Sequence, residues 1–354
     1  MKLQRYHDVN RRWMGVAVLC ALLLLLVQPT LAQDDVPDRL LFVGNFEGQD
    51  YEVYTGDLAS QRMRALTADE DNQTAAIWSP DATQVLYRTE PTSQRGNNLA
   101  ATFSSSVNTA SRLVLVNTDG SNPQVLALNV AQTPLFSFSP DGERIAYVKE
   151  TAGPVGTNNA LIIMDKTGAE LMTFDAPAGS PALLWSTDGT SLYYSDFGTR
   201  NAINNVMTRS SSTHPTLVRL DLTTGDETNL IELPEQSTVR ALTMSADQQT
   251  LYFIQRTPDE AQAWPELTLR AFDLTQNALS DLHTFEQGDR VPMIWEDAVG
   301  MSAAADGERL AIQLERRVPI DTDLFIYHLR DGTLTEIPVY DPLLTYEIDP
   351  GTLS

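Results

Sequence analysis

One short phrase occurs five times in the sequence, and this repetition constrains the fold more than any other feature. The phrase joins a turn, Ser-Pro-Asp-Gly in its clearest copy, to a following run of apolar residues. Successive copies are separated by 60, 47, 59 and 59 residues, a period that indicates a solenoid or a propeller. A four-stranded propeller blade needs about 40–45 residues, so each unit also carries extra loop. The copies are centred on Asp81, Asp141, Asp188, Asp247 and Asp306.

The unit that begins at residue 135 shows what fills one period. Its four strand-like runs, each bounded by Gly, Pro, Asp or Asn, are 135–139, 143–150, 159–168 and 169–174. The second and third runs of the units are apolar on both faces, as in ALIIM and SLYYS, which is expected of strands covered by neighbouring sheets. The fourth runs, such as ETNLIEL, are more polar. This pattern predicts an all-β propeller of four-stranded antiparallel blades with a polar outer rim.

The repeated acidic residues have a structural explanation in the turn itself. Ser-Pro-Asp-Gly places Pro where φ is near −65°, Asp where its carboxylate accepts a nearby backbone N–H, and Gly where φ becomes positive. We therefore interpret the five Asp residues as turn residues and not as catalytic carboxylates. Ala82 and Gln248 stand where other copies have Gly, and a positive φ there would cost on the order of 1 kcal/mol each.

These phrases resemble the TolB-like β-propeller repeat. The resemblance is carried by the strand-SPDG-strand order, by strands that end in D-x-T-G or N-T-D-G, and by the segment YEVYTGDLASQRMRALTADEDNQTAAIWSPD (51–81). It covers essentially the whole chain after residue 32 and implies a fold, not a function. It also implies an association with the bacterial cell envelope.

The two ends of the chain predict how the ring closes. Segments 38–45, 51–58 and 63–67 supply second, third and fourth strands without a first strand, and LTYEIDPGTLS (344–354) has the pattern of a first strand and its turn. We therefore expect six blades, one of them closed by strands from both termini, because closure removes exposed sheet edges. The alternative is that Asp-Pro-Gly is only a common turn near the end of the chain.

Residues 1–32 have the pattern of a signal peptide, which leaves residues 33–354 as the propeller. Four basic residues precede an apolar run of 14 residues (14–27), and small residues at positions 30 and 32 suit cleavage after Ala32. A retained membrane anchor is the alternative, but the run is short against the roughly 20 residues that span a bilayer. We expect an exported protein, periplasmic or extracellular, with no membrane span after the signal is removed. Cys20 is the only cysteine, so the chain after residue 32 has no disulfide and no thiolate ligand.

The charge is strongly acidic and excludes several kinds of partner. Removing residues 1–32 takes away four basic residues and one acidic residue, which leaves 20 Lys and Arg against 46 Asp and Glu, a net charge of −26. A surface of this sign repels nucleic acid and anionic membranes. We expect a monomer with no nucleic-acid partner.

The extra length of the units is concentrated in segments on one face, away from the SPDG turns. These are 91–111, 198–215, 257–266 and 285–300, and loops longer than about 12–15 residues in a compact domain are usually functional or disordered. They carry hydrogen-bond donors and two tryptophans suited to stack on a sugar ring or an apolar side chain, although these residues could instead pack within their own loops. The candidate binding residues are Arg95, Asn97, Asn98, Arg200, Asn201, Asn204, Arg209, Trp264 and Trp295.

Catalytic and metal motifs have little support. Asp69, Glu70 and Asp71 offer oxygen ligands that calcium could use, but their spacing matches no known calcium loop, and a solvated acidic turn explains them better. The histidines share no metal spacing, and the chain has no G-x-S-x-G elbow and no Gly-rich phosphate loop. We therefore predict no catalytic residue, no metal ligand and no cofactor.

Two hypotheses for function remain. The first is an exported, non-catalytic scaffold that binds a protein or peptide partner through the long loops. The alternative is a propeller that binds or cleaves carbohydrate through the loop aromatic and amide residues.

Overall fold

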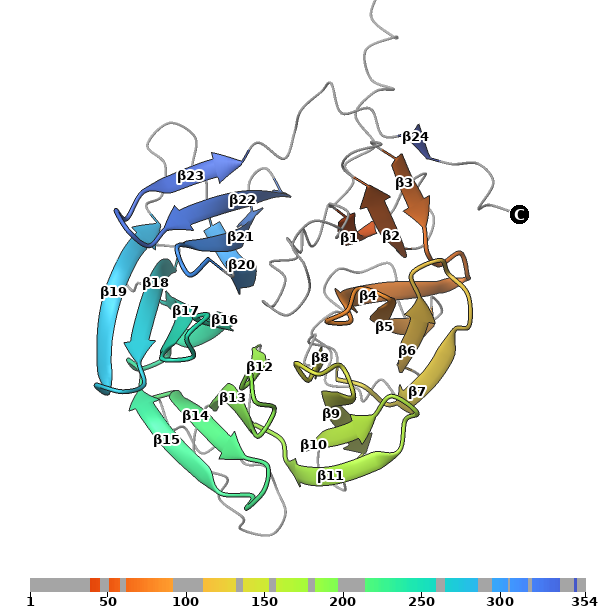
Figure 1. The fold of residues 1–354 in the computed structure, drawn as a ribbon, viewed down its shortest axis with the longest axis horizontal. Coiled ribbons are helices and arrows are strands. Elements are labelled where there is room, and N and C mark those ends of the chain that lie inside the picture. The colour runs from red at the N-terminus through yellow and green to blue at the C-terminus, as the bar shows by residue number, and fades with distance from the viewer. Residues whose placement is uncertain are drawn as a thin grey trace, which may run out of the picture.

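The protein is all-β in the part of the chain that the computed structural model describes, and its sheets are arranged around a centre (Figure 1). No helix long and apolar enough to cross a membrane occurs in that part of the chain. The described residues are 39–44, 51–57, 62–91, 111–131, 136–152, 157–177, 182–196, 214–258, 265–285, 295–304, 306–317, 320–337 and 347–348.

Five four-stranded antiparallel sheets form the blades of a propeller, and a further sheet contains the first strands of the chain. Blade 1 consists of β4 (Asp71–Trp78), β5 (Gln84–Pro91), β6 (Arg112–Asn117) and β7 (Gln124–Leu128). Blade 2 consists of β8 (Phe136–Phe138), β9 (Arg144–Ala152), β10 (Thr157–Asp165) and β11 (Glu170–Asp175). Blade 3 consists of β12 (Leu183–Trp185), β13 (Ser191–Asp196), β14 (Thr216–Asp221) and β15 (Glu227–Glu232). Blade 4 consists of β16 (Thr238–Met244), β17 (Thr250–Thr257), β18 (Glu266–Asp273) and β19 (Ala278–Phe285). Blade 5 consists of β20 (Trp295–Ala303), β21 (Arg309–Arg317), β22 (Ile320–His328) and β23 (Leu334–Ile337).

Within each blade the strands pair in chain order, with the first strand nearest the centre and the fourth outermost (Figure 1). The burial of the strands follows their position. In β13 the first five residues are buried, because both faces of this second strand are covered, whereas the outer strand β15 is exposed along most of its length. The four-stranded antiparallel blades predicted from the sequence are therefore confirmed.

Apolar side chains from facing sheets form the core between neighbouring blades. Between blades 1 and 2, Leu86 and Leu113 pack with Tyr147 and Ile162 in one buried cluster. Similar clusters join the other consecutive blades and join the N-terminal sheet to blade 1. Among the described residues, no such cluster joins blade 5 to the N-terminal sheet. The fold is thus stabilised mainly by packing between the faces of consecutive sheets.

The predicted closure by a sixth blade is wrong, because the C-terminal strand lies on the other side of the sheet. The N-terminal sheet has the order β1 (Arg39–Gly44), β2 (Glu52–Asp57), β3 (Arg62–Ala65) and β24 (Glu347–Ile348). A closing first strand would pair with β1 on the inner side, but β24 pairs in parallel with β3 on the outer side, over two residue pairs (Figure 1). An apolar pattern marks a segment as a strand, but it does not specify which edge of a sheet the segment joins.

The repeated turns are built as the sequence predicts. In four copies the Ser hydroxyl donates to the Asp Oδ1 at 2.5–2.6 Å, and in all five the Asp accepts the backbone N–H of the residue two positions later at 2.9–3.1 Å. These bonds stabilise the charged form, and the pKa of Asp141 lies below its ordinary value chiefly because of the Ser139 hydroxyl. Ala82 and Gln248 have φ of 54° and 63°, so both occupy the left-handed conformation that Gly adopts in the other copies. We call the side of the ring that carries these turns the turn face.

Candidate functional site

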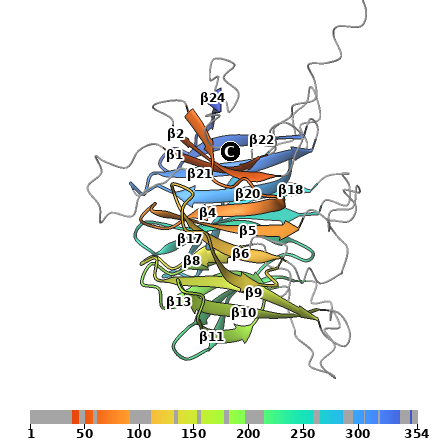
Figure 2. The same cartoon turned by 90° about the vertical axis from the view of Figure 1, so that its right-hand side faces the viewer.

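The predicted binding segments connect strand ends on the side of the ring opposite the turn face. Three of them follow second strands in the chain and precede third strands, and the fourth stands between β19 and β20. We call the side on which these second strands end the long-loop face (Figure 2 shows the blades turned by 90°). Of the predicted binding residues, Trp295 is the first residue of β20 and pairs with Arg316 in the sheet register. The following lie outside the described residues: Arg95, Asn97, Asn98, Arg200, Asn201, Asn204, Arg209 and Trp264.

The larger buried polar side chains lie in the halves of the strands nearest the long-loop face. On the turn face, the buried polar groups are small hydroxyl side chains of the turns and adjoining strand ends, such as Ser139 and Ser186. Toward the long-loop face the buried polar groups include side-chain amides and a guanidinium. Gln313 is a further buried amide, at the middle of its strand. Buried polar groups need hydrogen-bond partners, so this layer is where a polar ligand would find complementary groups. Its largest members are Asn72, Gln73, Arg88 and Gln255.

Arg88 is the most deeply buried cation described. Its side chain, 1% exposed, points from β5 toward blade 2, where Nε donates to the Val130 carbonyl at 3.3 Å. Nη1 donates to Thr74 Oγ1 at 2.9 Å and to Glu90 Oε2 at 3.1 Å. Burial lowers the pKa of Arg88, and Glu90 and Glu150 act in the opposite direction. The guanidinium therefore links blades 1 and 2 directly beneath the long-loop face.

Several atoms of this polar layer have no hydrogen-bond partner. They are Gln73 Oε1, Arg88 Nη2, Thr89 Oγ1 and Gln255 Oε1, each shielded from solvent. An unpaired buried polar atom destabilises a fold by about 1–3 kcal/mol, and an ordered water or a binding partner can supply the missing bond. Unpaired buried atoms at the other end of the strands are fewer, with Trp78 Nε1 and Thr187 Oγ1 as the examples.

In the acidic segment 67–74, whose carboxylates calcium could use, Asp69 and Asp71 contact groups of the protein. Asp69 Oδ1 accepts the backbone N–H of Asp71 at 2.9 Å and the side-chain amide of Gln73 at 3.1 Å. Asp71 forms an ion pair with Arg112. No group of three His, Cys, Asp or Glu side chains with metal-binding geometry occurs among the residues that the structure describes.

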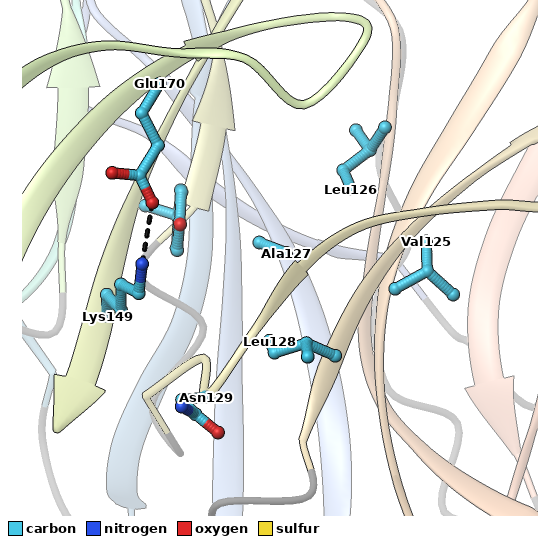
Figure 3. Close-up of a pocket in the computed structure, with 8 residues that line it drawn as sticks. Val125, Leu126, Ala127, Leu128, Asn129, Lys149 and Glu170 are labelled. Carbon is cyan, nitrogen blue, oxygen red and sulfur yellow. Dashed lines mark hydrogen bonds and ion pairs between the residues drawn. The ribbon is translucent and has the colours of Figure 1, made fainter. Parts of the chain in front are cut away.

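A separate open groove of about 480 Å³ lies on the outer rim, where blades 1 and 2 meet (Figure 3). Five consecutive residues at the end of blade 1, Val125–Asn129, form one wall, and Glu170 at the start of β11 contributes to the other. Tyr147 and Lys149 of β9 complete the lining, and Lys149 Nζ donates to Glu170 Oε1 at 2.6 Å. This groove was not predicted from the sequence.

The comparisons with known proteins establish the fold alone. An oligogalacturonate lyase in complex with manganese aligns with a TM-score of 0.55 and 14% identity, covering 84% of this chain and 73% of that chain. The hydrazine synthase of Kuenenia stuttgartiensis aligns with a TM-score of 0.55 and 13% identity, covering 86% and 80%. A TolB protein from Agrobacterium tumefaciens aligns with a TM-score of 0.52 and 14% identity, covering 79% and 86%. No family model matches the chain, and no curated protein matches its sequence. The TolB-like resemblance is thus supported at the level of the fold.

The neighbours differ in what their names say they do, so the fold does not choose between binding and catalysis. One is an enzyme that carries manganese, whereas TolB is not named as an enzyme.

The polar layer was missed from the sequence although a signal for it exists. Arg88, Gln255 and Gln313 interrupt the apolar second strands at seven or eight residues after the turn Asp. At the seventh residue after the turn Asp, three of the five copies have a polar residue (Arg88, Ser195 and Gln313) where a strand covered on both faces should be apolar.

Proposed function

We propose that the protein is an exported, non-catalytic propeller that binds a protein or peptide partner on its long-loop face. In this proposal residues 1–32 are a signal peptide, and residues 33–354 are the propeller, located in the periplasm or outside the cell. The observation that carries the proposal is the layer of buried amide and guanidinium groups beneath that face, with Arg88 Nη2 and Gln255 Oε1 unpaired. Peptide backbones offer both the donors and the acceptors that these groups lack.

The turn face provides the internal control for this proposal. Its Asp and Ser side chains bond one another and the turn backbone, so their hydrogen-bonding capacity is largely used within the turns. A partner that recognises polar groups therefore gains more on the long-loop face.

Site-specific photo-crosslinking in envelope extracts tests the choice of face. A photoreactive residue is introduced at Thr216 or Glu266, which begin third strands beside the long loops, or at Glu143 or Glu308, which are exposed on the turns. We expect the same crosslinked polypeptide from both loop-side positions and from neither turn position. Equal crosslinking from both faces, or none from any position, would contradict the proposal.

The second candidate function is carbohydrate binding or cleavage on the same face. It is favoured by the amides and the guanidinium of the polar layer, which suit sugar hydroxyls, and by the position of Trp295 at the loop-side end of β20. A glycan array with the unmodified chain, Trp264→Ala and Trp295→Ala separates the two functions. Specific glycan binding that is lost in the variants would favour carbohydrate, whereas an array without signal would favour a polypeptide partner.

A further inference from the structure

The outer strand of blade 1 lacks the charged residues that the other outer strands have. β7 reads Gln-Val-Leu-Ala-Leu and contains no charged residue. Each of the other outer strands contains at least one, and natural proteins use such charges to prevent exposed sheet edges from pairing with other chains. The outer strands and their charged residues are β3 with Arg62 and Arg64, β11 with Glu170 and Asp175, β15 with Glu227 and Glu232, β19 with Asp281, and β23 with Glu336.

Two of the three large apolar side chains that are exposed in the described part of the chain lie on β7 itself. Val125 is 51% exposed and Leu128 is 55% exposed on β7, and Leu171 is 50% exposed on β11 of the neighbouring blade. No other large apolar side chain in the described part of the chain is exposed to this degree. Two exposed apolar side chains on one uncharged edge strand offer an apolar contact to another polypeptide.

The rim groove runs along the same strand. It is lined by five consecutive residues, Val125–Asn129, and therefore by side chains that point to both faces of the blade as well as by the main chain between them (Figure 3). In the described part of the chain, β7 is the last strand of its sheet and its strand partner is β6. The β10–β11 turn of blade 2 contacts the strand at Gln124 and at the Leu126 main chain, and the groove lies beside it.

The protein already contains one example of a strand added to an outer edge. β24 joins the outer side of β3 in parallel, although β3 carries two arginines. β7 has the same place in blade 1, is one residue longer than β3, and has no charge to oppose pairing. β7 thus shares with β3 its place at the outer edge, although the pairing of β7 with β6 shifts register between Leu113 and Val114 and that of β3 with β2 is regular.

We propose that β7 is a docking edge for an extended segment of a partner polypeptide. The segment adds as a fifth strand by main-chain hydrogen bonds to β7, and apolar side chains at alternate positions of the segment contact Val125 and Leu128. This surface is distinct from the long-loop face, so the two proposals can fail independently.

Peptides selected from a phage-displayed random dodecapeptide library against the full chain provide the test. We expect the enriched peptides to alternate apolar and polar residues and to protect the amides of 124–128 from hydrogen exchange. Leu128→Lys should weaken their binding about tenfold or more, because the contact of a leucine-sized apolar surface is lost. The matched control is Thr228→Lys on the exposed outer strand β15, which should change binding by less than about twofold.

Two further measurements separate strand addition from apolar contact alone and from misfolding of the variant. N-methylation of alternate main-chain amides of a selected peptide should abolish binding in one register only, because only every second amide faces the edge strand. Because Leu128 is exposed, its lysine variant should melt at the same temperature as the unmodified chain. If its melting temperature falls sharply, Val125→Lys takes its place in the binding comparison.

Several results would overturn the proposal. These are a library without enriched peptides, peptides whose binding is equal in Leu128→Lys, Val125→Lys and the control, and binding that is insensitive to N-methylation in both registers. Dimerisation of the full chain in sedimentation experiments that is abolished by Leu128→Lys would instead assign the edge to a second copy of this protein.

Discussion

The contact between blades 1 and 2 permits a sharp test of how closely the blades pack. Gly168 has φ of +87°, and a Cβ built on it would lie 2.8 Å from the Leu126 carbonyl oxygen and 3.3 Å from Leu126 Cα. These are main-chain atoms of the neighbouring blade, so they cannot rotate away as a side chain could. For Gly168→Ala we expect about 1–2 kcal/mol from the left-handed conformation and about 1–3 kcal/mol from overpacking. The free energy of unfolding should fall by about 2–5 kcal/mol in all.

Gly307→Ala is the matched control because it has the conformational effect without the contact. Gly307 has φ of +70°, and no atom lies within 4 Å of a Cβ built there. Its substitution should lower the free energy of unfolding by only about 1 kcal/mol. Both variants are compared by urea unfolding followed by tryptophan fluorescence, with thermal unfolding by circular dichroism as a second measure. Equal losses in the two variants would refute the close approach of the blades at Leu126.

Other regions of the fold give further expected outcomes. Ala82→Gly should raise the free energy of unfolding by about 0.5–1 kcal/mol, because Ala82 has φ of 54°; an unchanged urea midpoint would contradict this. Ser139→Ala should raise the pKa of Asp141 toward its ordinary value of 3.8, since the Ser139 hydroxyl is the main cause of its depression. The stability linked to that depressed pKa is present above the unfolded value and is lost as the pH falls through the folded value, so the variant should lose less stability on acidification. Titration of the Asp141 carboxyl by NMR measures the shift directly, and an unmoved pKa would contradict the assignment. Arg88→Met should lower the free energy of unfolding by about 2–4 kcal/mol, because it removes the buried hydrogen bonds of the guanidinium to the Val130 carbonyl, Thr74 and Glu90; a loss below about 0.5 kcal/mol in urea unfolding would contradict that role. Deleting 343–354 should lower the melting temperature by no more than about 2 °C, because β24 contributes only two residue pairs; a large drop would restore the closing role that the sequence predicted.

The repeat allowed the blades and their turns to be predicted because these depend on local chemistry. The turn is specified by neighbouring residues, and Ser139 with Asp141 forms the bonds expected of it. The burial of both faces of a second strand could likewise be predicted, because its residues form an apolar run, as in β13. The edge that β24 joins depends instead on contacts between segments almost 300 residues apart, which the local pattern does not contain.

The candidate sites were less accessible from the sequence for two different reasons. Loop residues such as Arg200 and Trp264 were chosen by composition, and they remain predictions because they lie outside the described residues. The polar layer around Arg88 was visible as an interruption of an apolar strand, but its meaning depends on which atoms find partners across the interface between blades. The docking edge at β7 could be recognised only once the order of strands in the sheet was known, because the absence of charge matters only on a strand at the edge of its sheet.

The two proposed surfaces rely on opposite physical properties, and this makes their roles separable. The long-loop face has buried groups that lack hydrogen bonds, so a partner there is selected by polar complementarity. The β7 edge offers main-chain groups beside exposed Val125 and Leu128, so a partner there is selected by strand propensity and apolar contact. If one partner spans both surfaces, Leu128→Lys and a substitution on the long-loop face should weaken its binding by amounts that add, because the sites share no contacts. If two partners bind, each substitution should affect one partner and leave the other unchanged.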